Sequence, residues 1–409
     1  MSIKVKGFLK DVGGASRVTK LREENFAKGS PVADPRDPIR ELADQLHPAS
    51  MKVRVTEIRE ASPSSRTFRF VSCDGHIPVF QCGQYVNFRL RIGESVLSRP
   101  YTLSSAPYEA RGEHGFFEIT VRRNVPYLVP DYLFEQVKVG DVLDANLPFG
   151  NFYWEPMRDS RSIVALAGGS GITPFYSMAK EIACGKMQGV KLTVLYGSVK
   201  ADDIVLRDEL DAVEAACPDI RVVHVLSDEP DWPGEKGFIT RELIEKYSEG
   251  DVTYMFCGPL PMYTFVKKAL DDMGVTGRRF RHDVVNNPSD VSTLPGYPKG
   301  TEQKTFTISV WRGVHEDVIE ARASEPVAVA LERAGIAIDT HCRNGECGFC
   351  RSHLLSGEIF VSPIGDGRRR MDREMGWFHA YDHSFPLRSK AQKGMKPMAS
   401  NAASQNLLE

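Results

Sequence analysis

The sequence has no long hydrophobic run and no visible internal repeat. No apolar stretch approaches the roughly 20 residues that a helix needs to cross a bilayer, so the sequence does not predict a membrane-spanning protein. The N-terminal stretch MSIKVKGFLKDVGGASRVTKLREENF lacks the apolar centre of a signal peptide, and we therefore expect no export.

Neither sign of charge dominates. The chain has 52 Lys and Arg residues against 54 Asp and Glu residues, a net charge of −2 and an isoelectric point near 6.6. This balance lacks the basic excess with which proteins bind nucleic acid or an anionic membrane surface. The composition, 42% apolar and 26% charged, is that of an ordinary globular protein. A chain of 409 residues is too long for one core, so we expect roughly two to four domains.

Cysteine is scarce and unevenly placed. Of the 8 cysteines, most are dispersed, three gather in the stretch HCRNGECGFC, and none follows Cys350. A dispersed set with one tight cluster is not the pattern of a disulfide framework. It favours a reducing compartment and one metal site, and we expect a cytoplasmic protein.

The clustered cysteines have the spacing C-x4-C-x2-C. Cys342, Cys347 and Cys350 supply three of the four thiolates that a plant-type [2Fe–2S] cluster requires. Gly345 and Gly348 let the loop curl so that backbone N–H groups face the sulfur atoms. Zinc binding and no metal at all are the alternatives, and the C-x4-C opening argues against zinc.

The hydrophobic pattern changes along the chain and predicts its organisation. Short alternating strands predict an antiparallel barrel, and continuous apolar strands alternating with helices predict a doubly wound parallel sheet. A stretch rich in Pro, Gly and Ser indicates a linker before a compact third domain. The predicted ranges are an extension over 1–50 that packs on the first domain and has a short helix at DPIRELADQL, a barrel over 51–157, a parallel-sheet domain over 158–286, a linker over 287–304, a third domain over 305–387 and a disordered tail over 388–409.

The stretch AGGSGITP stands where a predicted strand passes into a helix. Glycines allow a pyrophosphate to approach the backbone, and the N-terminus of the helix favours its charge. The spacing is not G-x-G-x-x-G, so a tight turn without a ligand is the alternative. Two further motifs favour a ligand: CGP at 257–259 ends a later strand at the same sheet edge, and RPYTLSS at 99–105 combines an arginine for a phosphate with a tyrosine for a flat heterocycle.

These three motifs, in this order and with the cysteine loop, resemble the ferredoxin–NADP reductase superfamily, in its iron–sulfur flavoprotein branch. The resemblance covers about 51–387. It implies a multidomain fold of α/β plus all-β type: an antiparallel flavin-binding barrel, a doubly wound parallel nicotinamide-binding domain and a C-terminal β-grasp domain of the ferredoxin type.

The resemblance also implies roles for individual residues. Arg99 would pair with the flavin phosphate, Tyr101 would flank the isoalloxazine, and Thr102 would bond near flavin N5. Cys257 and Gly258 would lie beside the nicotinamide, although Cys257 is also simply a small core residue in the alternative interpretation. Asp283 aligns with an acid near the flavin and is a candidate proton relay. The cofactor-binding set is completed by Leu103 in the flavin motif and by Gly168, Gly169, Gly171, Thr173 and Pro174 in the nicotinamide pyrophosphate loop.

The sequence departs from the family in the second flavin-phosphate turn. The aligned stretch is VPYLVPDYL, in which Pro126 and Pro130 replace residues that donate hydrogen bonds to phosphate. We therefore expect the flavin to dissociate more readily than usual. The stretch LPFGNF favours FAD, with FMN as the alternative. Val199 stands where relatives often have an arginine for a 2′-phosphate, which favours NADH, while Lys200 leaves NADPH open.

The fourth thiolate of the cluster is missing. In relatives it follows about 30 residues after the loop, and here Tyr381 holds that position. His379, Asp382 and His383 are candidate replacements, and we take His383 as the fourth metal ligand. A cluster with three ligands, or none, is the alternative. Imidazole in place of thiolate should raise the reduction potential by on the order of 100 mV. The basic stretch RRRMDRE at 368–374 is a candidate docking site for an acidic redox protein or a solvated loop.

The predicted function is that of an NAD(P)H-dependent oxidoreductase. Electrons pass from NADH through flavin and a [2Fe–2S] cluster to a partner redox protein, with no nucleic acid and no membrane span involved. Two alternatives stay open. The first alternative is an electron-transfer subunit of a larger redox complex. The second is a diaphorase that reduces dyes or free flavin and whose cluster site has degenerated.

Overall fold

The computed structural model describes residues 8–29, 37–123, 128–285, 290–338, 340–343, 347–361, 377–379, 383–384 and 395–397. The chain divides into two compact units, Met1–Leu46 and His47–Glu409. The first unit contains helix α1 (Phe8–Lys28) and helix α2 (Pro38–Leu46). Helix α2 is the predicted short helix, whereas α1 was not predicted; it includes Gly13 and Gly14, which both disfavour a helix. Within the described part of the chain, no helix combines the length and apolarity needed to cross a bilayer.

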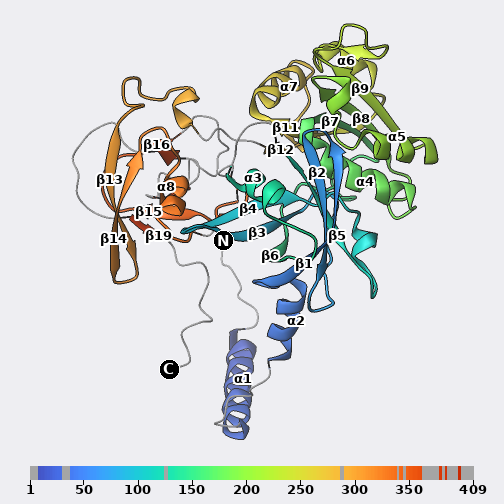
Figure 1. The fold of residues 1–409 in the computed structure, drawn as a ribbon. Helices are drawn as coiled ribbons and strands as arrows, with labels where there is room; N and C mark the ends of the chain where they lie inside the picture. Colours follow the sequence, from blue (N-terminus) through green and yellow to red (C-terminus); the bar gives the residue numbers. More distant parts are fainter. Residues whose placement is uncertain are drawn as a thin grey trace, which may run out of the picture. The chain divides into compact units, whose positions relative to one another are not determined.

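The second unit begins with an antiparallel sheet that closes into a barrel (Figure 1). Val53 and Val55 of β1 are fully buried, while the neighbouring Lys52 and Arg54 are exposed. This alternation is expected of a strand with one face on a core. A bridge between Leu103 and Ile119 joins the end of β4 to β5 and so closes the sheet. The strands are β1 (Met51–Ser62), β2 (Ser65–Ser72), β3 (Tyr85–Ile92), β4 (Ser95–Thr102), β5 (Phe117–Arg122) and β6 (Val142–Phe149), in the order β4-β3-β6-β1-β2-β5; helix α3 (Leu128–Glu135) follows β5.

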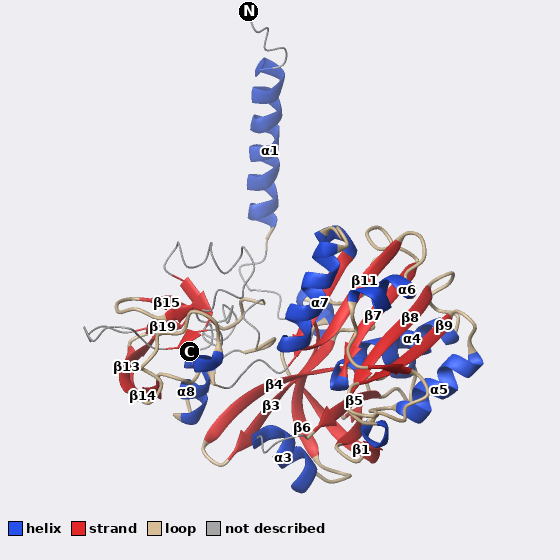
Figure 2. Ribbon diagram, turned by 90° about the horizontal axis from the view of Figure 1, so that it is seen from above, coloured by secondary structure: helices blue, strands red, loops and turns tan. Residues whose placement is uncertain are grey.

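The next domain is a six-stranded parallel sheet in the order β10-β9-β8-β7-β11-β12. Alternate residues of its first strand pack into different cores: Ala165 packs with helix α4, and Leu166 packs with helix α7. Figure 2 shows helices on both sides of this sheet. The predicted doubly wound domain is therefore present. Its strands are β7 (Ser162–Gly168), β8 (Lys191–Ser198), β9 (Ile220–Leu226), β10 (Glu235–Lys236), β11 (Val252–Pro259) and β12 (Phe280–Val285), and its helices are α4 (Thr173–Ala183), α5 (Arg207–Ala216), α6 (Arg241–Lys246) and α7 (Leu260–Asp272).

The last domain has a mixed sheet in the order β14-β13-β19-β15-β17, with helix α8 packed on it. Strand β19 lies within the tail that was predicted to be disordered. It pairs with both β13 and β15, whose facing backbone groups need hydrogen-bond partners, and that part of the tail prediction is corrected. The elements are β13 (Thr305–Arg312), β14 (His315–Arg322), α8 (Val327–Arg333), β15 (Arg351–Leu354), β16 (Phe360–Val361), β17 (Trp377–His379), β18 (His383–Ser384) and β19 (Met395–Pro397).

Part of the predicted linker packs against this last domain. The N–H of Val291 donates to the carbonyl of Ser324 at 2.8 Å. The ring of Tyr297 lies edge-on to Phe360, with 5.2 Å between the ring centroids. The stretch is rich in Pro, Gly and Ser, but its apolar residues give it a small core of its own with Phe360.

Candidate functional site

The predicted nicotinamide residues meet at the carboxyl edge of the parallel sheet. The last residues of β7 lie beside those of β11, with Ala167 in register with Cys257. This is the point where the strand order reverses, which is where doubly wound sheets bind ligands. A Cβ atom on Gly171 would lie 2.1 Å from the carbonyl oxygen of Cys257, so only glycine fits there. Gly168, Gly169, Gly171, Thr173, Pro174, Cys257 and Gly258 are all brought together at this edge, next to the N-terminus of α4.

A cation that the motifs did not reveal lies over the glycine loop. Gly169 has a φ of +53°, and a Cβ atom there would lie 2.7 Å from Nη1 of Arg122. Nη2 of Arg122 pairs with the Asp203 carboxylate at 2.5 Å, and Nε donates to Ser64 Oγ at 3.0 Å. The barrel thus holds a positive charge beside the loop in which a pyrophosphate is expected. A contact between separate domains leaves no local signal in the sequence.

Cys257 and Asp283 occupy neighbouring positions on paired strands. They are in register in β11 and β12, and Cys257 is fully buried. Burial, followed by the charge of Asp283, raises the pKa of the Cys257 thiol well above its usual value. Burial also raises the pKa of Asp283 from 3.8 to about 6. A carboxyl group with this pKa exchanges its proton near neutral pH, as a proton relay must.

The flavin motif lies on β4, beside β3. Thr102 is in register with Tyr85, and Tyr101 is partly buried against the barrel core, with its ring 6.2 Å from that of Phe88. The side chain of Leu103 is fully buried in this core, and its N–H donates to the carbonyl of Gln84 at 3.0 Å. Leu103 therefore closes the barrel, and its side chain is not available to a ligand.

Arg99 can bind a phosphate while it keeps its hydrogen bonds to Ser98 and Glu332. Its Nη1 donates to the carbonyl of Ser98 and to Glu332 Oε1, both at 2.9 Å. Within the described residues these are its hydrogen bonds, which leaves Nε and Nη2 for a flavin phosphate. Pro130 lies in the first turn of α3, where backbone N–H groups have no partner in the helix, so it removes one donor without breaking the helix. Pro126 lies outside the described residues.

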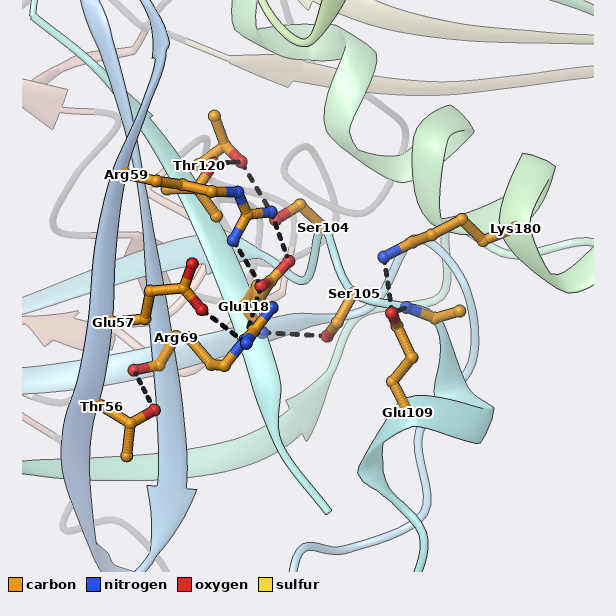
Figure 3. Close-up of polar contacts among 12 residues, drawn as sticks. Thr56, Glu57, Arg59, Arg69, Ser104, Ser105, Glu109, Glu118, Thr120 and Lys180 are labelled. Carbon is orange, nitrogen blue, oxygen red and sulfur yellow. Dashed lines mark hydrogen bonds and ion pairs between the residues drawn. The ribbon is translucent and has the colours of Figure 1, made fainter. Parts of the chain in front are cut away.

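A buried carboxylate anchors the barrel side of the flavin motif (Figure 3). Glu118, whose side chain is 2% exposed, bonds both terminal nitrogens of Arg59, at 2.6 and 3.0 Å, and Nε of Arg69 at 2.9 Å. Burial alone would raise its pKa, but the hydrogen bonds and charge of Arg59 outweigh burial, and the pKa of Glu118 lies below its ordinary value. The backbone N–H of Glu118 donates to Ser105 Oγ at 2.9 Å, which fixes the end of the RPYTLSS motif.

Helix α4 is joined to the same motif from the other side. Ser177 Oγ donates to the carbonyl of Ser105 at 2.7 Å. Lys180 Nζ pairs with the carboxylate of Glu109 at 2.5 Å (Figure 3), and Glu181 accepts the backbone N–H of Tyr108 at 2.8 Å. The helix that begins at the glycine loop is therefore tied to the end of the RPYTLSS motif and to the short turn that follows it.

The cysteine loop brings two of its thiols together. The N–H of Cys347 donates to Cys342 Sγ at 3.4 Å, and hydrogen bonding from Cys342 lowers the pKa of the Cys347 thiol. Gly348 has a φ of +78°, a conformation that favours glycine. Cys350 is buried in the core of the domain. An N–H directed at sulfur fits an iron–sulfur cluster, although the described residues contain no group of three or more His, Cys, Asp or Glu side chains placed to hold a metal.

Of the candidates for the fourth ligand, the structure describes the backbone of two. Gly345, Tyr381, Asp382 and the stretch 368–374 lie outside the described residues, and of His379 and His383 only the backbone is described. Strand β17 pairs His379 with Arg351, the residue after Cys350. Strand β18 pairs His383 with Val361. The backbone of His379 is thus the nearer of the two in register to the cysteine loop.

Aromatic rings join the cysteine loop to the barrel. The ring of His341 stacks on Phe349 with 3.8 Å between centroids and lies 4.3 Å from that of Phe149. Phe149 in turn stacks on Tyr85 at 5.9 Å. Burial, and then the charges of Cys347, Cys342 and Asp283, raise the pKa of Tyr85. Tyr85 is therefore close enough to the cysteine loop and to Asp283 to sense their charges, and no motif pointed to it.

Comparisons with known proteins agree with this geometry. Three family models match in chain order: the oxidoreductase FAD-binding domain over 52–154, the oxidoreductase NAD-binding domain over 165–268 and the 2Fe-2S iron-sulfur cluster binding domain over 313–377. FAD, NAD and a [2Fe–2S] cluster are therefore the cofactors that these three domains define.

Two kinds of curated relative are similar to the chain. The chain is 30% identical over 217 residues to NADH-cytochrome b5 reductase 1 of Dictyostelium discoideum, which covers 52% of this chain and 73% of the relative. It is 26% identical over 330 residues to the glycine betaine monooxygenase reductase subunit of Chromohalobacter salexigens, covering 76% of this chain and 87% of the relative. It is 32% identical over 185 residues to the NADH-cytochrome b5 reductase 1 of Neosartorya fischeri. This alignment covers 43% of the chain and only 59% of the length of that relative.

Among solved structures, phthalate dioxygenase reductase has the same fold. It aligns with 85% of this chain and 98% of its own, with a TM-score of 0.61 and 18% sequence identity. That reductase is described as a modular structure for electron transfer from pyridine nucleotides to [2Fe-2S]. The three domains in this order place the chain in the ferredoxin–NADP reductase superfamily. It belongs to the branch of iron–sulfur flavoprotein reductases with a C-terminal [2Fe–2S] domain.

Proposed function

We propose that the protein takes hydride from NADH and passes the electrons through FAD and a [2Fe–2S] cluster to a partner redox protein. The single observation that carries this proposal is the convergence of the three sites: the glycine loop and the flavin motif are joined through α4, and the cysteine loop packs on the barrel through Phe149. When bound, the flavin accepts a hydride and releases electrons one at a time to the cluster.

The chain's own residues bind and orient these groups. Arg99 and the first turn of α3 hold the flavin phosphate, with Thr102 at the ring. The glycine loop and Arg122 hold the pyrophosphate, and Cys257 sets the position of the nicotinamide. Tyr101 flanks the flavin, and Asp283 exchanges the proton that accompanies reduction. The exposed Val199 offers no positive charge to a 2′-phosphate, which supports NADH over NADPH despite the neighbouring Lys200.

Cys342, Cys347 and Cys350 are the proposed cluster ligands, and His383 is the proposed fourth, with His379 as its alternative on backbone register. Exchanging each histidine for alanine separates the two. Replacing the histidine that binds the cluster should abolish the low-temperature EPR signal of the dithionite-reduced protein. Replacing the histidine that does not bind it should leave the signal unchanged. A signal that survives both substitutions would exclude both histidines.

The central test is anaerobic purification followed by iron and flavin analysis. We expect one FAD and two irons per chain, bleaching of both centres on addition of NADH, and reduction of cytochrome c that is lost in Cys347→Ser. Reduction of ferricyanide, which can accept electrons directly from the flavin, should persist in Cys347→Ser. Protein without flavin or iron after reconstitution would refute the proposal.

A second candidate is a diaphorase that uses the flavin and nicotinamide domains alone. The absence of a cysteine after Cys350 and the relatives named NADH-cytochrome b5 reductase 1 favour it. Equal reduction of ferricyanide and cytochrome c by the full chain and by Cys347→Ser would support this alternative.

The partner follows from the same proposal. The relative from Chromohalobacter salexigens is named a monooxygenase reductase subunit, which supports an oxygenase component as the acceptor. The cysteines support a cytoplasmic location, since most of them are dispersed rather than arranged as a disulfide framework.

A further inference from the structure

One carboxylate connects the flavin strand, the last domain and the cysteine loop. Glu332 lies in α8 and its side chain is 3% exposed. Its Oε1 accepts from Nη1 of Arg99 at 2.9 Å and from Nη1 of Arg343 at 2.6 Å, and its Oε2 accepts from Nη2 of Arg343 at 3.2 Å. Arg99 comes from β4 of the barrel, and Arg343 directly follows Cys342 in the cysteine loop. Three segments far apart in the sequence therefore meet at Glu332.

The two arginines approach each other closely. Both donate to the carbonyl of Ser98, Arg99 at 2.9 Å and Arg343 at 3.2 Å, and both are largely buried, with side chains 21% and 10% exposed. Two guanidinium groups that share acceptors repel each other, and the repulsion is strong where water is excluded. No other carboxylate of the described residues pairs with Arg99. The contact between the domains at this point therefore depends on the negative charge of Glu332.

The cysteine loop accepts backbone strain to make this contact. Arg343 has a φ of +53°, in the left-handed region that residues other than glycine disfavour. The side chain that this conformation presents is the one that Glu332 binds through both oxygens. Strained residues persist where their surroundings fix them, and they concentrate at functional sites.

We propose that Glu332 is a positioning residue for electron transfer, which holds the cysteine loop against the flavin strand by bridging Arg343 and Arg99. This inference rests on the proposed function, because it concerns the step in which reduced flavin gives one electron to the oxidised cluster. Glu332 touches neither group. It fixes the separation and orientation of the two groups, on which the rate of electron transfer depends.

The same contact couples flavin binding to the docking of the last domain. Arg99 binds Glu332 through Nη1 and presents its other nitrogens to a flavin phosphate. A phosphate bound there orders Arg99, and an ordered Arg99 binds Glu332 more tightly. By linkage, loss of Glu332 should weaken flavin binding as well as docking.

The test compares Glu332→Gln with wild type in the full chain loaded with FAD and iron. Gln keeps the shape of the side chain and removes the charge. Stopped-flow mixing with NADH should show an unchanged rate of flavin reduction and at least a tenfold slower bleaching of the cluster. Hydrogen exchange of residues 96–101 and 327–333, measured without NADH, should be faster in the variant.

Glu325→Gln is the matched control. Glu325 also lies beside α8, with a side chain 10% exposed and an arginine partner at 2.5 Å, but that partner, Arg333, belongs to the same domain. The control should match wild type in the rates of flavin reduction and cluster bleaching and in the exchange of residues 96–101. If Glu332→Gln loses its cofactors on purification, Glu332→Asp, which keeps the charge on a shorter side chain, should give an intermediate rate.

Two results would overturn the inference: cluster bleaching as fast as in wild type, or flavin reduction slowed as much as cluster bleaching, which would indicate a merely structural role. Failure of the proposed function gives a different result. NADH would then leave the flavin of the wild-type protein oxidised, while the exchange measurement would still report on Glu332.

Discussion

Replacing Asp283 with asparagine should stabilise the protein at alkaline pH. Burial raises the pKa of this carboxyl from 3.8 to about 6, a difference of about two units. Each unit corresponds to 1.36 kcal/mol, so ionised Asp283 lowers the free energy of unfolding by at most about 3 kcal/mol. The figure is an upper limit because Asp283 retains some exposure to solvent.

The sign of the pH dependence follows from linkage. The folded state binds the proton more tightly than the unfolded chain does, so the protonated carboxyl favours the folded state and ionisation opposes it. Wild type should therefore lose stability relative to Asp283→Asn as the pH rises from about 4 through 6. Above pH 7 the difference should be constant and at its largest, several degrees in the midpoint of thermal unfolding.

The assay is thermal unfolding of both proteins between pH 4 and pH 8, followed by intrinsic fluorescence. Asp251→Asn is the control, since Asp251 is exposed and pairs with Arg279 at the surface, at 2.7 Å. Its curve should run parallel to that of wild type. Parallel curves for Asp283→Asn and wild type across this range would refute the argument that burial shifts this carboxyl.

Three further predictions concern the glycine loop, the barrel and the flavin. Gly171→Ala should raise the KM for NADH at least about tenfold in steady-state assays, because its Cβ would lie 2.1 Å from the carbonyl oxygen of Cys257; an unchanged KM would contradict the close packing. Glu118→Gln leaves Arg59 and Arg69 without their buried carboxylate. It should lower the stability of β5, measured by hydrogen exchange, by about 3 to 5 kcal/mol. Glu57→Gln, which breaks a more exposed pair with Arg69, should lower it by less than about 1 kcal/mol. FAD should be lost on dialysis against strong salt, and stoichiometric FAD after dialysis would show that Pro130 does not weaken the site.

The sequence was most informative where a motif coincides with a strand end. The stretch SIVALAGGSGITP predicted a buried strand, a glycine turn and a helix, and β7 and α4 bear this out, because the pattern is local. The partners that hold the site in place were not predictable. Arg122, Tyr85 and Glu332 act across domain boundaries, and a contact between distant segments has no signature in either segment.

Two local patterns were misleading. Gly13 and Gly14 disfavour a helix, yet α1 includes both. The polar tail predicted disorder, yet β19 pairs on both sides with backbone groups of the last domain, and backbone pairing places little demand on side-chain type.

The ties between α4 and the flavin motif limit how the chain can be recombined with its relatives. A chimaera joined between the barrel and the parallel-sheet domain would bring in a foreign α4, and Glu109 and the carbonyl of Ser105 would lose Lys180 and Ser177 unless the donor supplied both. Exchange of nicotinamide specificity by grafting should therefore succeed only when the incoming helix carries these two residues, whatever the similarity of the grafted glycine loop.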